Sequence, residues 1–258
     1  MTYFIKHISG RNAILWHVFR TMRVLLLAIL FSNLAPAGTA HATDDNILQK
    51  HRKTAIYQKL DLMDREQGAD ATQLYVLEKI SELLSPTENA GNGDDLRAIF
   101  TWLQDWPDAN RHPLYGLVLS EHFLTMLQSD LPIHDLQHET LVRKMLQNYF
   151  LAFLIIREEM ARCAHPSQES AVGNSFVAFL LRYKLYKTLF NTLDDTQKRL
   201  IYRYIEKQEQ LMHNRPLTDK YCIKPGEEAA EFLPLEDWQK KRADLLQELK
   251  DALTEQKP

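Results

Sequence analysis

The feature that most constrains the fold is a run of eight apolar residues, 149–156, inside the stretch 141–163. A helix with apolar side chains all round has no face for water, so it must lie between other helices. The flanks favour a helix over a strand because apolar positions recur at three-to-four spacing. These positions are Leu141, Met145, Ala152, Ile156 and Cys163. Since a membrane span needs roughly 20 apolar residues, the run predicts a central core helix packed within protein.

Helical patterns also fill the rest of the chain after residue 42, with no alternating strand run, fixed-period repeat or sustained heptad. Glycine, proline and capping residues divide these patterns into segments. The predicted helices cover residues 47–65, 71–84, 96–106, 113–128, 141–163, 174–191, 195–213 and 235–253. We therefore expect an all-α fold of about eight helices around the central helix, in a single domain over residues 43–258.

The helices 174–191 and 195–213 are expected to form a hairpin around residues 192–194, each with one apolar face toward the core. The pattern assigns to these faces Phe176, Leu180, Tyr183, Leu185, Leu189, Leu200, Tyr204, Ile205 and Leu211.

The first 42 residues have the layout of a cleavable secretory signal. They contain no Asp or Glu, carry four basic residues ahead of the apolar block 24–31, and end in Ala40-His41-Ala42. This pattern predicts cleavage after Ala42 and a periplasmic protein with no stable membrane span after cleavage. Residues 22–42 alone form a signal of ordinary length, so Met22 is an alternative start.

Removal of this segment leaves 27 Lys and Arg against 34 Asp and Glu, because four of the 31 basic residues are lost. A surplus of seven negative charges argues against nucleic acid as the partner, and so does export. An exported chain with two cysteines, Cys163 and Cys222, is expected to pair them, since an oxidising compartment favours a disulfide.

Two small groups are candidates for chemistry. His134 and His138 stand four residues apart, a spacing that places both rings on one helix face for a metal. If Asp135 is the helix N-cap, however, His134 lies outside the helix and the two rings do not converge. Glu158 and Glu159 follow the apolar run, where a partly buried carboxylate could act as a general acid. Arg157 and Arg162 are near enough in sequence to neutralise such a carboxylate. The alternative interpretation is a solvated helix end with an i,i+4 pair between Glu158 and Arg162.

The strongest feature for binding is a concentration of positive charge. Residues 182–207 contain seven basic and three acidic side chains, a local surplus of four positive charges. Arg199, Arg203 and Lys207 share one helix stripe, and Tyr202 is close to it. Such a stripe suits an acidic protein or an anionic envelope component, although a plain charged outer face is the alternative.

Taken together, these patterns favour an exported helical protein that acts by binding, such as an envelope accessory factor or an inhibitor of a secreted enzyme. The competing hypothesis is an envelope-acting hydrolase with Glu158 or Glu159 as acid, or a metal at His134 and His138. No nucleophile motif or phosphate-binding loop is found in the sequence, so we favour binding over catalysis and expect no bound cofactor.

The first testable prediction is cleavage after Ala42. N-terminal sequencing of protein recovered from the native cell envelope should give a chain beginning at Thr43, because Ala40-His41-Ala42 is the small-x-small site. A recovered chain that retains residues before Val24 would contradict the export signal.

Overall fold

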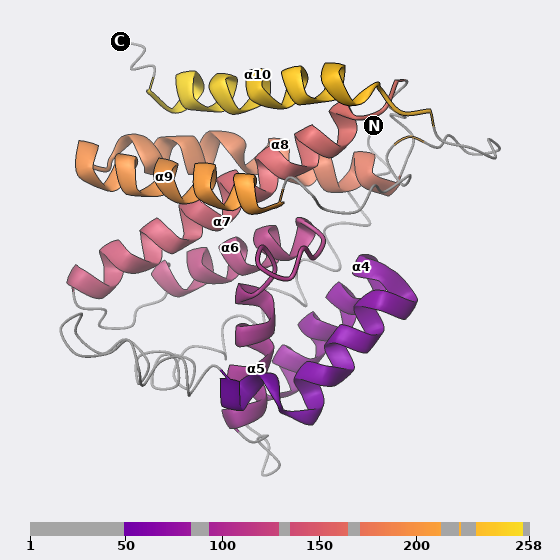
Figure 1. The fold of residues 1–258 in the computed structure, drawn as a ribbon. Coiled ribbons are helices and arrows are strands. Elements are labelled where there is room, and N and C mark those ends of the chain that lie inside the picture. Colours follow the sequence, from indigo (N-terminus) through magenta and orange to yellow (C-terminus); the bar gives the residue numbers. More distant parts are fainter. Residues whose placement is uncertain are drawn as a thin grey trace, which may run out of the picture. The chain divides into compact units, whose positions relative to one another are not determined.

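A computed structural model describes residues 49–83, 93–128, 135–164, 171–212, 222 and 231–254, with side chains left out for 135–137 and 171–178. Within these ranges the only strand-like feature is one isolated bridge, so the all-α class predicted from the sequence is confirmed (Figure 1). The helices are α4 (Ala55–Leu83), α5 (Gly93–Gln104), α6 (Leu114–Leu127), α7 (Asp135–Ala161), α8 (Ala171–Asn191), α9 (Asp195–Leu211) and α10 (Leu235–Thr254). The predicted signal and its cleavage site lie outside the described residues.

Helix α4 is two helical arms joined at a glycine. Gly68 has φ 81° and ψ 177°, a backbone conformation that glycine adopts without the penalty a side chain would bring. This break falls between the two helices predicted at 47–65 and 71–84. The seven helices named above, with α4 divided into two arms, agree with the expectation of about eight helices.

The chain groups into two compact units, each built from two stretches of sequence. Unit 1 takes in the residues up to Asp105 and Leu124–His138, and unit 2 takes in Trp106–Phe123 and Glu139 onward. The boundaries pass through α6 and α7, so helix assignments alone do not reveal them. A single domain over residues 43–258 stays a prediction.

Unit 1 is held together by hydrogen bonds between the start of the described chain and α5. Asp105, directly after α5, accepts two hydrogen bonds of 2.8 Å from the Arg52 guanidinium and one of 2.7 Å from the Tyr57 hydroxyl. The indole of the buried Trp102 donates to Asp61 of α4 at 2.7 Å. Together these bonds hold residues 52–61, which include the start of α4, against α5 and the residue that follows it.

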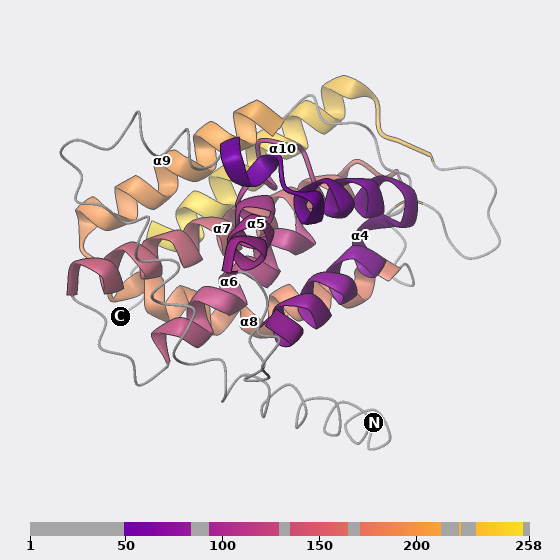
Figure 2. The same ribbon diagram turned by 90° about the horizontal axis from the view of Figure 1, so that it is seen from below.

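In unit 2 the helices lie in the order α6, α7, the pair α8 and α9, then α10, as Figure 1 shows. Seen from below, α8 and α9 lie on different sides of α7 (Figure 2). The apolar run of α7 is buried along its whole length, including Phe150, Phe153, Leu154 and Ile156. The prediction of a central helix without a solvent face is therefore confirmed.

Aromatic rings join α7 to α8. Tyr149 stacks on Tyr186 with ring centroids 3.9 Å apart, and its hydroxyl donates to the Phe179 carbonyl at 2.6 Å. The Tyr186 hydroxyl reaches Glu121 of α6 at 3.0 Å. Burial raises the pKa of both phenols well above the usual tyrosine range, so both remain neutral hydrogen-bond donors. The rings therefore bury large area while every buried hydroxyl has a partner.

Helices α6 and α7 approach closely at a glycine. A Cβ at Gly116 would lie 2.8 Å from the Ala152 Cβ and 2.8 Å from the Trp106 ring. The Ser120 hydroxyl, one turn on, donates to the Gly116 carbonyl at 2.7 Å and also lies 3.1 Å from the carbonyl of Met145. Small side chains at this crossing allow the two backbones to meet.

The predicted faces of the α8–α9 hairpin are only partly correct. Ile205 is buried, and Tyr183, Leu189 and Tyr204 are half-buried, whereas the Phe176 side chain lies outside the described residues. Four leucines assigned to the core are exposed instead: Leu180, Leu185, Leu200 and Leu211. On α8 the stacked aromatic rings select the buried face. On α9 a buried carboxylate, described below, takes the inward position.

The second prediction concerns the core. Leu154→Ala should lower the free energy of unfolding by roughly 2–5 kcal/mol, because Leu154 is 1% exposed and its removal leaves a cavity. The matched control is Leu74→Ala on α4, whose side chain is 68% exposed and should cost under about 0.5 kcal/mol. Urea unfolding measures both, and equal losses would contradict the central position of α7.

Candidate functional site

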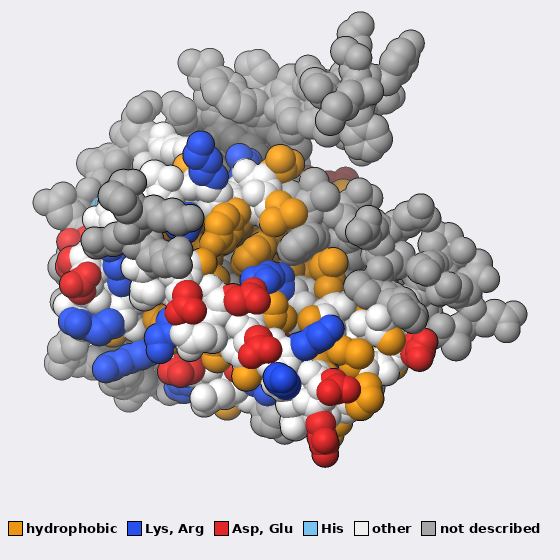
Figure 3. Space-filling view, turned by 90° about the horizontal axis from the view of Figure 1, so that it is seen from above, with side chains coloured by type: hydrophobic (Ala, Val, Ile, Leu, Met, Phe, Trp, Pro, Cys, Tyr) orange, Lys and Arg blue, Asp and Glu red, His pale blue; other side chains and the backbone are white. Residues whose placement is uncertain are grey.

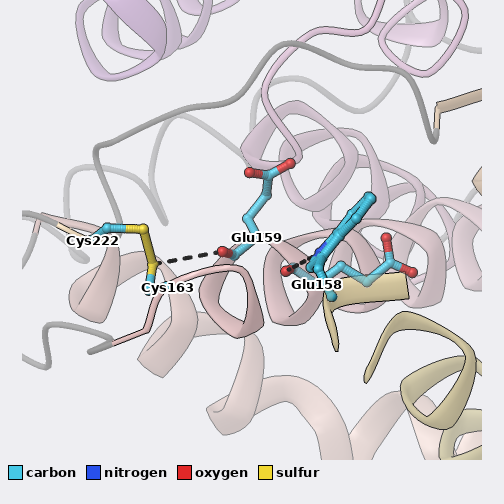
Figure 4. Close-up of a disulfide and its surroundings, with 5 residues drawn as sticks. Glu158, Glu159, Cys163 and Cys222 are labelled. Atoms are coloured by element: carbon cyan, nitrogen blue, oxygen red, sulfur yellow. Dashed lines mark hydrogen bonds between the residues drawn. A yellow bond between two sulfur atoms is a disulfide. The ribbon is translucent and has the colours of Figure 1, made fainter. Parts of the chain in front are cut away.

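The end of α7 is tied down by the disulfide predicted from the sequence. Cys163 and Cys222 are bonded, with Cα atoms 5.1 Å apart, and both are buried (Figure 4). The residues around Cys163 also pair with the segment before α10. Ala164 donates its backbone N–H to the Glu231 carbonyl at 2.9 Å, and Leu233 donates to the Arg162 carbonyl at 2.8 Å. Two distant parts of the chain are thus fixed at one helix end.

Glu158 and Glu159, the predicted candidate acids, lie just before this disulfide and are 0% and 3% exposed. Figure 4 shows their carboxylates pointing in different directions, as expected for adjacent residues on a helix. The Cys163 sulfur lies 3.8 Å from the Glu159 carbonyl oxygen; a disulfide sulfur carries no proton, so this is a packing contact. A general acid must reach its substrate, and the burial of both carboxylates gives no such access.

Two arginines near these carboxylates contact α10. Arg157 forms an ion pair of 2.7 Å with Glu248 of α10, on the surface. The Arg162 guanidinium lies 4.0 Å from the ring centroid of Trp238, which donates its indole N–H to the Glu158 carbonyl at 3.4 Å. These contacts bind α10 to the end of α7.

Another buried carboxylate, Glu209 of α9, was not predicted. It is 2% exposed and forms an ion pair with Arg242 of α10, whose guanidinium also donates to the Glu209 carbonyl at 3.2 Å. Arg242 lies 5.8 Å from the Trp238 ring centroid. The sequence does carry one signal: Glu209 continues the inward stripe of Ile201 and Ile205 at i, i+4 spacing.

The metal site considered at His134 and His138 stays a prediction, because the structure describes only one of the two histidines. Helix α7 begins at Asp135, so His134 precedes it and lies outside the described residues, whereas His138 is exposed on the first turns. Across the described ranges, no three His, Cys, Asp or Glu side chains form a group that could hold a metal ion.

The predicted basic stripe lies on the outer side of α9, the helix in front of α8 in Figure 1. Arg199, Arg203 and Lys207 are all exposed. The Arg199 guanidinium lies 3.2 Å from the Thr196 hydroxyl, and within the described residues none of the three cations forms an ion pair with Asp194, Asp195 or Glu206. We call these three residues the α9 basic face.

Tyr202 sits at the edge of this face, toward α10. The Lys250 ammonium lies 5.5 Å from the centroid of its ring. Burial, followed by the negative charges of Glu206, Asp251 and Glu209, raises the pKa of Tyr202 to about 12. The phenol therefore stays protonated at neutral pH and can donate a hydrogen bond to an anionic ligand.

No protein-family model, no curated protein and no solved structure matches the chain. In the described residues, no helix combines the length and the apolar character that a membrane span requires.

The third prediction tests the buried ion pair. Arg242→Met leaves the Glu209 carboxylate buried without its counter-ion, so the free energy of unfolding should fall by about 3–5 kcal/mol. Arg157→Met removes a pair whose side chains are 28% and 59% exposed, so it should cost under about 1 kcal/mol. Urea unfolding distinguishes the two variants. Equal, small losses would mean that Glu209 finds solvent or another partner.

Proposed function

We propose that this is an exported helical protein that acts by binding an acidic partner through the α9 basic face. The observation that carries the proposal is that Arg199, Arg203 and Lys207 are exposed together on one helix. Among the residues that the structure describes, they form no ion pair with Asp194, Asp195 or Glu206. A cation that already forms an ion pair attracts an acidic partner only weakly. The positive charges of these three residues are available to attract one.

The charge of the whole chain supports the same proposal. The sequence has 34 acidic and 31 basic residues, so a basic face is opposite in sign to the rest of the molecule. Such segregation raises the encounter rate with an acidic partner and orients it on arrival. The partner class is an acidic protein or an anionic component of the envelope.

Export and a periplasmic location are part of the proposal. The predicted signal motivates them, and the disulfide between Cys163 and Cys222 is compatible with an oxidising compartment. The alternative, a hydrolase, gains no support from Glu158 and Glu159, because both carboxylates are buried.

The fourth prediction is loss of partner capture after charge reversal. The variant R199E/R203E/K207E, used as bait in an extract of the native envelope, should capture no partner, whereas the wild-type chain should capture one. Capture by the wild type should weaken with added salt, because the Debye length is only about 8 Å at physiological ionic strength.

A matched control distinguishes the effect of reversing the α9 basic face from the effect of changing the net charge. K53E/K240E/K241E changes the net charge by the same amount at three exposed lysines on other elements and should leave capture intact. The helical circular-dichroism signal should be unchanged in both variants. Capture that survives reversal of the α9 basic face, or that is lost equally in the control, would refute the proposal.

A further inference from the structure

Helix α8 presents leucines to solvent. Leu180, Leu181 and Leu185 are 48%, 78% and 37% exposed, whereas Phe179, Tyr186 and Phe190 on the opposite side are buried. The buried side already packs on the rings of α7. The outer side, which we call the α8 leucine face and define as Leu180, Leu181 and Leu185, is thus an apolar surface that the described residues do not cover.

The charge on α8 is of one sign. Its 21 residues include no Asp or Glu, but they include Arg182, Lys184 and Lys187. Lys184 is exposed and lies between the leucines, since residues 181, 184 and 185 follow the spacing of one helix face. Arg182 lies at the side, in an ion pair of 3.1 Å with Glu121 of α6. Helix α10 differs, because it carries both acidic and basic side chains. Both kinds are intermingled on the face that Figure 3 shows.

The exposed leucines and the basic side chains of α8 together indicate what kind of partner can bind the α8 leucine face. A second copy of the chain, docked face to face, would bring Lys184 toward the same lysine of the partner, and like charges repel. A helix in a protein groove needs a concave, pocketed surface, whereas Leu181 projects from a convex helix with most of its side chain exposed. Projecting leucines beside lysine, without acids, are typical of helices that lie at the surface of an anionic bilayer.

We propose that the α8 leucine face binds the surface of an anionic phospholipid bilayer, with Leu181 and Leu185 entering the interface and Lys184 contacting lipid phosphates. The helix lies on the bilayer and does not cross it. This surface is distinct from the α9 basic face and belongs to a different helix, so the protein has one surface for the membrane and another for an acidic partner.

Vesicle flotation of the full chain tests the proposal. Wild-type protein should float with vesicles of phosphatidylglycerol and phosphatidylcholine in equal parts, and L181Q/L185Q should bind about tenfold less, because two apolar side chains no longer leave water. The matched control, L62Q/L74Q, alters two leucines of α4 that are 46% and 68% exposed and should bind like the wild type. All three chains keep residues 24–31, so any contribution from that apolar block is common to them.

A local probe makes the test independent of total binding. Tryptophan emission of Leu181→Trp should shift to shorter wavelength when anionic vesicles are added, and that of Leu74→Trp should not. Vesicles of phosphatidylcholine alone should produce a much smaller shift, and salt should reduce the shift on anionic vesicles.

Three results would overturn the proposal. One is flotation of L181Q/L185Q that equals that of the wild type. Another is a Leu181→Trp emission spectrum that does not shift with anionic vesicles, or that shifts equally with uncharged ones. The third is a spectral shift with lipid-free envelope proteins but not with vesicles, which would make the face a protein-binding surface. The outcome is separate from the α9 experiment, because R199E/R203E/K207E leaves every leucine of α8 in place.

Discussion

The structure of unit 2 depends on the burial of α7, whose apolar run leaves no position that can face water. Once that helix is placed centrally, its neighbours must supply apolar surface on several sides. They do so by different means: α6 approaches closely at Gly116, and α8 stacks Tyr186 on Tyr149. The packing of α6 and α8 around α7 therefore follows from one apolar segment that must be buried.

Several polar groups where α10 meets α9 and the end of α7 are held by specific partners. Glu209 and Arg242 form an ion pair, and the indole of Trp238 donates to a carbonyl of α7 while arginine side chains lie over its ring. A buried ion pair adds little net stability compared with an apolar pair, but each charge strongly requires the other. Such a pair favours one register between α9 and α10. The disulfide joins Cys222 to Cys163, just after the end of α7.

Features set by local pattern could be predicted from the sequence. The apolar run marked α7, a glycine marked the break in α4, and an even cysteine count in a chain with a predicted export signal indicated the disulfide. Features that depend on distant residues could not. Glu209 is buried because it forms an ion pair with Arg242, which lies 33 residues further along the chain. A prediction that counts only apolar residues places Leu211 in the core instead, although Leu211 is exposed. The exposed leucines of α8 were missed for a similar reason, since aromatic stacking chose the buried side.

The same rotation that buries Glu209 also creates the α9 basic face. Successive residues on a helix are about 100° apart, so Lys207 lies about 200° from Glu209 and Arg203 lies on that same far side. Turning the carboxylate toward Arg242 therefore turns both cations toward solvent. The ion pair between Glu209 and Arg242 fixes this rotation of α9. The packing that places Glu209 against α10 thus also leaves Arg203 and Lys207 exposed on the outer side of α9.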